Sequence, residues 1–66
     1  MKNELFGRIQ EEKNELDEKL TKLYAFVESK KFENLSSVHK MLLKKQLDTM
    51  ADYSAILSVR IELLNK

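Results

Sequence analysis

Two adjacent stripes of residues at helical spacing run along the second half of the chain, between Ser36 and Leu64. The first stripe is apolar except at one serine and comprises Leu43, Leu47, Met50, Ser54, Leu57, Ile61 and Leu64. Its alternating steps of four and three residues are the a/d spacing of a helix that packs lengthwise against another helix. We therefore expect one long helix here, with the first stripe as a core seam.

The second stripe keeps the same spacing but mixes aliphatic side chains with an amide, a hydroxyl, a phenol and a guanidinium. Its members are Leu42, Gln46, Thr49, Tyr53, Ile56, Arg60 and Leu63. Such a mixed stripe suits a subunit interface or the wall of a ligand site. The sequence leaves open which stripe faces the rest of the chain, because both would be buried once several chains assemble.

A second amphipathic helix is expected upstream, where six apolar residues recur at helical spacing: Leu5, Ile9, Leu16, Leu20, Leu23 and Val27. The chain has no proline and a single glycine, Gly7, so no strong helix breaker lies beyond residue 7. The apolar repeat lapses at Glu12 and Lys13. Together with Gly7, this lapse predicts a short N-terminal helical segment over residues 2–11. Three ion pairs at i,i+4 are expected on the exposed face: Glu4 with Arg8, Glu15 with Lys19 and Glu18 with Lys22.

The break between the two helices must come from residues that favour caps and turns, namely Ser29, Asn34, Ser36 and Ser37. Phe32 and Leu35 lie within this break and are too apolar for a free loop. We expect them to form a short helical turn that closes the end of the hairpin. The predicted fold is all-α: a single antiparallel two-helix hairpin domain over residues 1–66, with helices at about 3–29 and 37–65 and a turn at 30–36.

A chain of 66 residues buries only about 60% of the surface that its unfolded form exposes. It has no cysteine and one histidine, His39, so neither disulfides nor a zinc site can add stability, and no metal or other cofactor is expected. Self-association into a helical bundle is the remaining way in which so small a chain can gain stability. No segment has the length of a membrane span or the apolar region of a signal peptide, and we expect an intracellular soluble protein without membrane contact.

Catalytic chemistry finds little support in the residues. A nucleophile and its base would have to be Ser36 and His39. These two residues are three positions apart at the expected start of a helix, where a serine is ordinarily an N-cap. The acidic run alternates with lysines at helical spacing, as a solvated face does, and comprises Glu11, Glu12, Glu15, Asp17 and Glu18. We expect neither a catalytic site nor an enzyme.

Six residues are candidates for ligand binding: Lys40, Lys44, Gln46, Thr49, Tyr53 and Arg60. Tyr53 can stack on a base, although a half-buried interface tyrosine is the ordinary alternative. Arg60 can pair with a phosphate, or else form a salt bridge between helices. Lys40 and Lys44 repel each other unless an anion lies between them, but lysines also simply aid solubility.

The net charge of +1 argues against a general nucleic-acid binder, although residues 30–45 carry five lysines and one glutamate. Binding of DNA or RNA through this patch would depend steeply on salt. We do not expect it.

The pattern of residues resembles that of a known family. It reads Leu20-x-x-Leu23-x-Ala25-Phe26-Val27-x-Ser29-x-x-Phe32-x-x-Leu35 and then Leu42-Leu43-x-x-Gln46-Leu47-x-x-Met50-x-x-Tyr53-x-x-Ile56-Leu57-x-x-Arg60-Ile61. The family consists of very short tailed-phage proteins, often described as related to a crAss-like phage protein. Its helical hairpin is similar to that of phage anti-CBASS and anti-Thoeris sponge proteins, and the likeness covers residues 9–64.

The resemblance implies a phage protein in the cytoplasm of the infected bacterium. It would sequester cyclic di- or trinucleotides, or cyclic ADP-ribose-type signals, without cleaving them. The resemblance also implies a homo-oligomer, with a hexamer favoured and a dimer as the smaller option, and ligand pockets between protomers. The competing hypothesis is a structural adaptor that binds itself or another protein through Gln46, Thr49, Tyr53 and Arg60.

Overall fold

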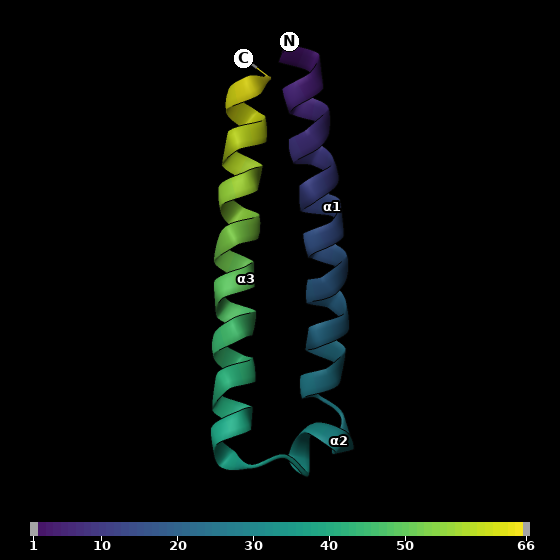
Figure 1. Cartoon of the computed structure of the whole chain (residues 1–66), viewed down its shortest axis with the longest axis vertical. Helices are drawn as coiled ribbons and strands as arrows, with labels where there is room; N and C mark the ends of the chain where they lie inside the picture. The colour runs from purple at the N-terminus through teal and green to yellow at the C-terminus, as the bar shows by residue number, and fades with distance from the viewer. Residues whose placement is uncertain (1, 66) are drawn as a thin grey trace.

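The computed structural model describes the backbone of residues 2–65 and the side chains of residues 4–65. It has three helices: α1 (Lys2–Val27), α2 (Lys30–Glu33) and α3 (Ser37–Leu64). Figure 1 shows α1 and α3 side by side and antiparallel, with α2 at one end and both termini at the other. The all-α hairpin is thereby confirmed, while residues 1 and 66 of the expected domain lie outside the described residues.

One serine ends α1 and begins α2. The Ser29 hydroxyl donates to the Phe26 carbonyl oxygen at 2.6 Å and accepts from the Phe32 backbone N–H at 3.4 Å. This double role explains why α1 stops at Val27, two residues before the expected end, since the backbone at Ser29 is already extended as an N-cap.

The start of α3 follows the same capping chemistry. The Ser36 hydroxyl accepts from the His39 backbone N–H at 3.1 Å, and Ser36 itself has extended backbone angles. The prediction that Ser36 is a helix cap is confirmed.

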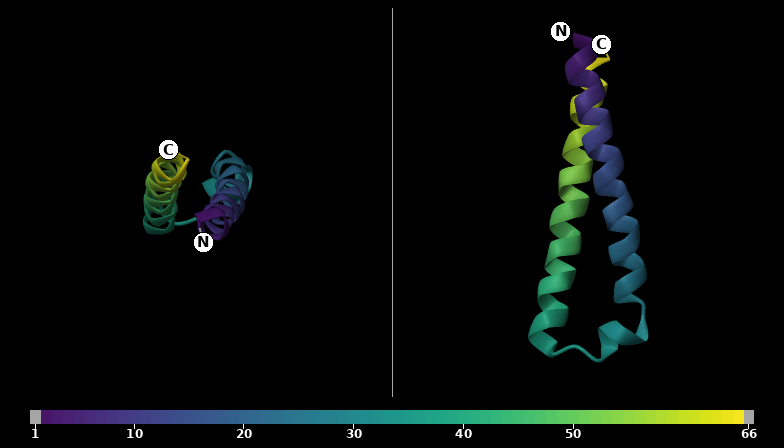
Figure 2. Two further views of the ribbon diagram at one scale, coloured as in Figure 1. Left: turned by 90° about the horizontal axis from the view of Figure 1, so that it is seen from above. Right: turned by 45° about the vertical axis from the view of Figure 1, so that its right-hand side comes forward.

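Aromatic packing closes the turn end of the hairpin. Phe32 of α2 is buried, and its ring meets that of Phe26 edge-on at a centroid distance of 6.3 Å. The two long helices are inclined to each other and lie further apart at the α2 end (Figure 2). The Phe26 and Phe32 rings pack at this wider end. The expected short helical turn around Phe32 and Leu35 is confirmed, with Phe32 buried and Leu35 half-buried.

The first stripe of α3 forms the seam with α1. Leu57 is fully buried at 0% exposure, and the other six members of the stripe are half-buried. From α1, Ile9 and Leu20 are buried in the same seam. The question of which stripe faces the first helix is therefore answered in favour of the apolar one.

Two expectations for the first helix are wrong. α1 runs without a break from Lys2, so residues 2–11 are not a separate segment. Glycine costs a helix about 1 kcal/mol but leaves its hydrogen bonds intact, so Gly7 does not interrupt it.

The second wrong expectation concerns the three i,i+4 ion pairs. None of them forms within 4.0 Å among the described side chains, and the ion pair that does form there joins Lys13 to Asp17. Exposed pairs gain little against the entropy of two long side chains.

Across the described residues, no helix is long and apolar enough to cross a membrane.

The continuity of α1 predicts that Gly7→Ala stabilises the protein. A Cβ placed at Gly7 meets nothing within 4 Å, and alanine is favoured over glycine in a helix interior by about 1 kcal/mol. Urea denaturation followed by circular dichroism should show an increase of about 0.5–1 kcal/mol in the free energy of unfolding. Gly7→Pro should lower it, and an Ala variant that is no more stable would argue for a kink at this position.

Candidate ligand-binding surface on α3

The second stripe of α3 lies on the surface of the hairpin. All seven members are exposed, from Leu42 near the turn to Leu63 near the open end. Because α1 occupies only the neighbouring face of α3, the described part of the chain leaves this stripe exposed. The polar members are therefore available to a ligand or to another chain.

Tyr53 is held at the edge where α3 meets α1. Its phenol hydroxyl donates a hydrogen bond to the Glu12 carboxylate, which reaches across from α1. The side chain keeps 40% of its surface exposed, so the ring is oriented by this bond and still available for stacking. Tyr53 is thus a half-exposed edge residue in the single chain, with a fixed ring and an acidic neighbour.

Among the described residues, the other polar members of the stripe form no hydrogen bond to α1. The Thr49 hydroxyl donates to the Lys45 carbonyl oxygen at 3.0 Å, and Gln46 makes a long contact of 3.9 Å with the Met50 sulfur. Arg60 is exposed and forms no ion pair within 4.0 Å among the described residues. The alternative for Arg60, a salt bridge between the helices, is therefore not formed among the described residues.

Lys40 and Lys44 lie on a different side of α3. Their ammonium groups sit over the Phe32 ring, at 5.9 and 6.0 Å from its centroid, where cation–π attraction favours them. Lys44 and Tyr53 are nine residues apart, which is two and a half turns and places them on opposite sides of the helix. The six candidate residues thus form two groups, and one chain does not bring them together.

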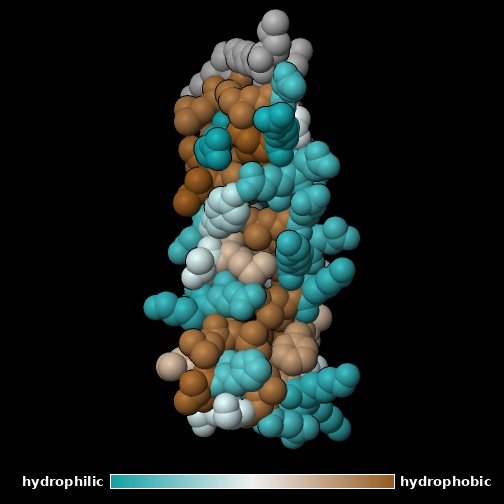
Figure 3. Space-filling view, viewed as in Figure 1, coloured by the Kyte–Doolittle hydropathy of each residue, from teal (hydrophilic) through white to brown (hydrophobic). Residues whose placement is uncertain are grey.

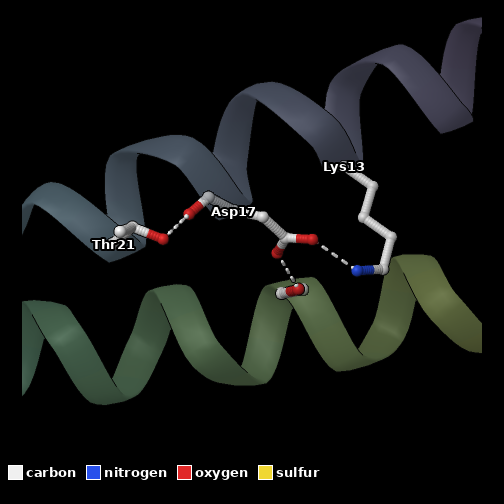
Figure 4. Close-up of polar contacts among 4 residues, drawn as sticks. Lys13, Asp17 and Thr21 are labelled. Atoms are coloured by element: carbon white, nitrogen blue, oxygen red, sulfur yellow. Dashed lines mark hydrogen bonds and ion pairs between the residues drawn. The ribbon is translucent and has the colours of Figure 1, made fainter. Parts of the chain in front are cut away.

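A polar layer crosses the apolar seam beside Tyr53. Asp17 of α1 accepts a 2.5 Å hydrogen bond from the Ser54 hydroxyl of α3 and forms a 2.6 Å ion pair with Lys13 (Figure 4). These two donors, the Lys13 ammonium first, lower the pKa of Asp17, while partial burial opposes the shift. The layer fixes the register of α1 on α3 and hence the position of Glu12 under Tyr53.

A family model described as Sequestin matches residues 3–63 of the chain. The chain belongs to the Sequestin family. No curated protein and no solved structure matches it. For this Sequestin chain, the described residues include no group of three or more histidine, cysteine or acidic side chains that could hold a metal ion.

The site of this Sequestin chain includes residues that our sequence reasoning missed. Glu12, Lys13 and Asp17 were assigned to a solvated helix face, yet they supply the bond to Tyr53 and the polar layer. The signal was present in the lapse of the apolar repeat at Glu12 and Lys13 and in the lone serine of the first stripe, Ser54. Polar residues at seam positions of two antiparallel helices mark places where the helices can hydrogen-bond to each other.

The lowered pKa of Asp17 predicts a pH-dependent contribution to stability. Because the pKa in the folded state lies below the ordinary value of 3.8, the contribution is complete above that value and is lost as pH falls through the folded pKa. Asp17→Asn should therefore be less stable than the wild type near pH 7, by less than about 1 kcal/mol because the ion pair is partly exposed. The difference should shrink as the pH falls through the folded pKa of Asp17.

Urea denaturation at several pH values tests this, with Glu15→Gln as the control because Glu15 is an exposed carboxylate on the same helix. A destabilisation of Asp17→Asn that does not diminish as the pH is lowered from neutral into the acid range would contradict the assignment.

Proposed function

We propose that this protein binds a nucleotide second messenger and sequesters it without cleaving it. The ligand class is a cyclic di- or trinucleotide or a cyclic ADP-ribose-type molecule, as the resemblance to phage sponge proteins implies. In this proposal the protein acts in the cytoplasm of a phage-infected bacterium and removes the signal of a CBASS or Thoeris defence system. Membership of a family named Sequestin is consistent with holding a ligand.

The observation that carries the proposal is a line of three polar side chains that the hairpin leaves exposed. Gln46, Tyr53 and Arg60 are spaced by seven residues, so they follow one line along α3. The line combines a guanidinium, an oriented phenol and an amide. A nucleotide has a use for each of them.

The chemistry of the three groups matches the parts of a nucleotide. The exposed face of Tyr53 offers a stacking platform, and base stacking on an aromatic ring contributes about 1–3 kcal/mol. The Arg60 guanidinium can donate two parallel hydrogen bonds to a phosphate. Glu12, anchored beside the ring by the Tyr53 hydroxyl, can accept from a ribose hydroxyl or an exocyclic amine but would repel a phosphate. A base and ribose at Tyr53 with a phosphate toward Arg60 is the orientation that these charges favour.

Assembly is part of the proposal, since one exposed line on a single helix has no opposite wall. Ligand sites generally enclose most of a small molecule in a concave pocket. We place the site between protomers of a homo-oligomer, with a hexamer favoured by the resemblance and a dimer as its smallest unit. Lys40 and Lys44, which one chain holds apart from Tyr53, would join such a site only from a neighbouring protomer.

Retention without cleavage follows from the kinds of side chain on this surface. Amide, hydroxyl, phenol and guanidinium groups bind phosphates and bases but are poor nucleophiles without an adjacent activating base. His39, the one histidine of the chain, is exposed, and the nearby Ser36 hydroxyl accepts from a backbone N–H as a helix cap. The messenger is held in the intact form.

Isothermal titration against a panel of cyclic dinucleotides, cyclic trinucleotides and cyclic ADP-ribose isomers tests the proposal. At least one member should bind with micromolar or tighter affinity and should be recovered intact by chromatography. Arg60→Ala and Tyr53→Ala should each weaken binding at least tenfold, which corresponds to about 1.4 kcal/mol. No binding across the panel at micromolar protein would refute the proposal.

The chain supplies a matched control for the tyrosine substitution. Tyr24 is its second tyrosine and is exposed on α1. Tyr24→Ala should leave the affinity unchanged.

A second candidate function is that of an adaptor that binds protein through the same stripe. The observation in its favour is the exposure of Leu42, Ile56 and Leu63 beside the polar line. The adaptor function is supported if no member of the nucleotide panel binds and if Tyr53→Ala and Arg60→Ala change the oligomeric mass in light scattering. It is contradicted if both variants keep the wild-type mass but no longer bind the nucleotide.

A further inference from the structure

The face of α3 that points away from α1 has the residue spacing of a coiled-coil seam. Two lines with a spacing of seven residues run along it: Leu42, Thr49, Ile56 and Leu63 in one, and Val38, Lys45, Asp52 and Val59 in the other. All eight residues are exposed, and the exposed fraction of the five larger aliphatic side chains is 53–63%. We call these two lines the outer seam. They occupy the a and d positions of a heptad repeat.

The single hairpin exposes more surface than a chain of its mass ordinarily does. Its accessible surface is 5347 Å² for 7.8 kDa, whereas folded monomers of that mass expose about 4,400 Å². The excess, about 950 Å², is of the order of the ~800 Å² that each partner buries in a stable protein interface. The radius of gyration of 15.0 Å also exceeds the roughly 11 Å expected of a compact domain of this length.

The order of residues along the outer seam indicates what covers it. Aliphatic residues lie at both ends, and Lys45, Thr49 and Asp52 lie in the middle. Figure 3 views the two helices side by side and shows the outer face of α3 only at its edge; on the face drawn, hydrophobic patches toward both ends are separated by a more mixed surface. A surface with this order is complementary to a second copy of itself turned end for end, because apolar ends then meet apolar ends.

Charge selects the antiparallel orientation over the parallel one. In a parallel, in-register pair, Lys45 would face Lys45 and Asp52 would face Asp52, which is unfavourable. In an antiparallel pair, each a position meets a d position of the other chain. Leu42 then meets Val59, Leu63 meets Val38 and Ile56 meets Lys45, while the Lys45 ammonium comes within one turn of the other chain's Asp52.

We propose that a second copy of this chain covers the outer seam, with the two α3 helices packed antiparallel about a two-fold axis at the level of Met50 and Ala51. The interface is isologous, so each contact occurs twice. The Lys45 and Asp52 pairs at its centre set the register and orientation at some cost in stability, as polar residues at coiled-coil core positions do.

This dimer brings the polar lines of the two chains together. His39, Gln46, Tyr53 and Arg60 share one flanking position of the heptad repeat, and two-fold symmetry places both copies of that flank on the same side of the interface. Tyr53 then lies near the other chain's Gln46, and Arg60 near the other chain's His39. α1 lies on this same side, because the Tyr53 hydroxyl reaches Glu12.

The two α1 helices therefore lie on either side of the paired α3 helices, so that they form the walls of a concave groove whose floor is the two α3 flanks. The groove has tyrosines and amides in its middle and an arginine with a histidine at each end. That the groove takes a nucleotide rests on the proposed function, whereas the dimer itself does not.

Light scattering of the ligand-free protein tests the dimer. The wild type should have twice the mass of the chain, or an even multiple of it. Ile56→Asp buries a carboxylate in the outer seam and should weaken association at least tenfold without loss of helicity, because Ile56 is 56% exposed in the hairpin. Ser58→Asp is the matched control, since Ser58 is exposed on another face of α3 and its variant should keep the wild-type mass. A monomeric wild type, or an Ile56→Asp variant of unchanged mass, would overturn the proposal and leave this face to another occupant.

Disulfide cross-linking tests the orientation, since the chain has no cysteine of its own. A mixture of Leu42→Cys and Val59→Cys chains should form a disulfide-linked dimer on oxidation. Each variant alone should not, because an antiparallel pair separates two copies of either residue by about 25 Å at 1.5 Å per residue. Efficient cross-linking of Leu42→Cys alone, with none between the two variants, would show a parallel arrangement and contradict the proposal.

The two sets of experiments fail independently. An oligomer that binds a nucleotide but keeps its mass in the Ile56→Asp variant would refute the outer-seam dimer and leave the proposed function standing. An antiparallel dimer that binds no member of the panel would do the reverse.

Discussion

A hairpin of two helices has a single seam, and each helix can turn only one face toward it. In this protein the seam takes the first stripe of α3, with Leu57 fully buried, and Ile9 and Leu20 of α1. Every other aliphatic residue of α3 must then stay in water or find a partner outside the chain. The exposed second stripe, the outer seam and the excess of surface area all follow from this one constraint.

The seam also positions the candidate site, because its one polar layer sets the register of the helices. Asp17 binds both Lys13 on its own helix and Ser54 on the opposite one, and a shift by one turn would leave the carboxylate without the Ser54 hydroxyl. In this register Glu12 comes to the Tyr53 hydroxyl. The orientation of the phenol ring on the outer surface is thus determined by hydrogen bonds at the edge of the core.

Much of the fold could be predicted because its determinants are local. Ser29 and Ser36 cap helices through bonds to residues three positions away, and the period of the apolar residues identifies the seam face. The break expected at Gly7 was wrong because a glycine weakens a helix without removing a hydrogen bond. The ion pairs expected on α1 were wrong because spacing permits such pairs but adds little energy to them on an exposed face.

The site was less predictable, because it depends on contacts between residues far apart in the chain. Helical spacing alone places Lys40 and Lys44 away from Tyr53, and the structure adds that both lysines lie over Phe32. The bond between Glu12 and Tyr53 spans 41 positions and depends on the register of two helices, which no single repeat reveals. The sequence analysis therefore found the polar line on α3 but not its partner on α1.

The central claim is that a ligand is held intact between chains that each contribute one stripe. Native mass spectrometry of the protein purified from bacteria that produce nucleotide immune signals tests this claim most directly, because one spectrum reports both the number of chains and the mass of what they retain. The account predicts assemblies with an even number of chains that carry an uncleaved nucleotide. A nucleotide retained by a single chain, or a cleaved product in its place, would contradict it.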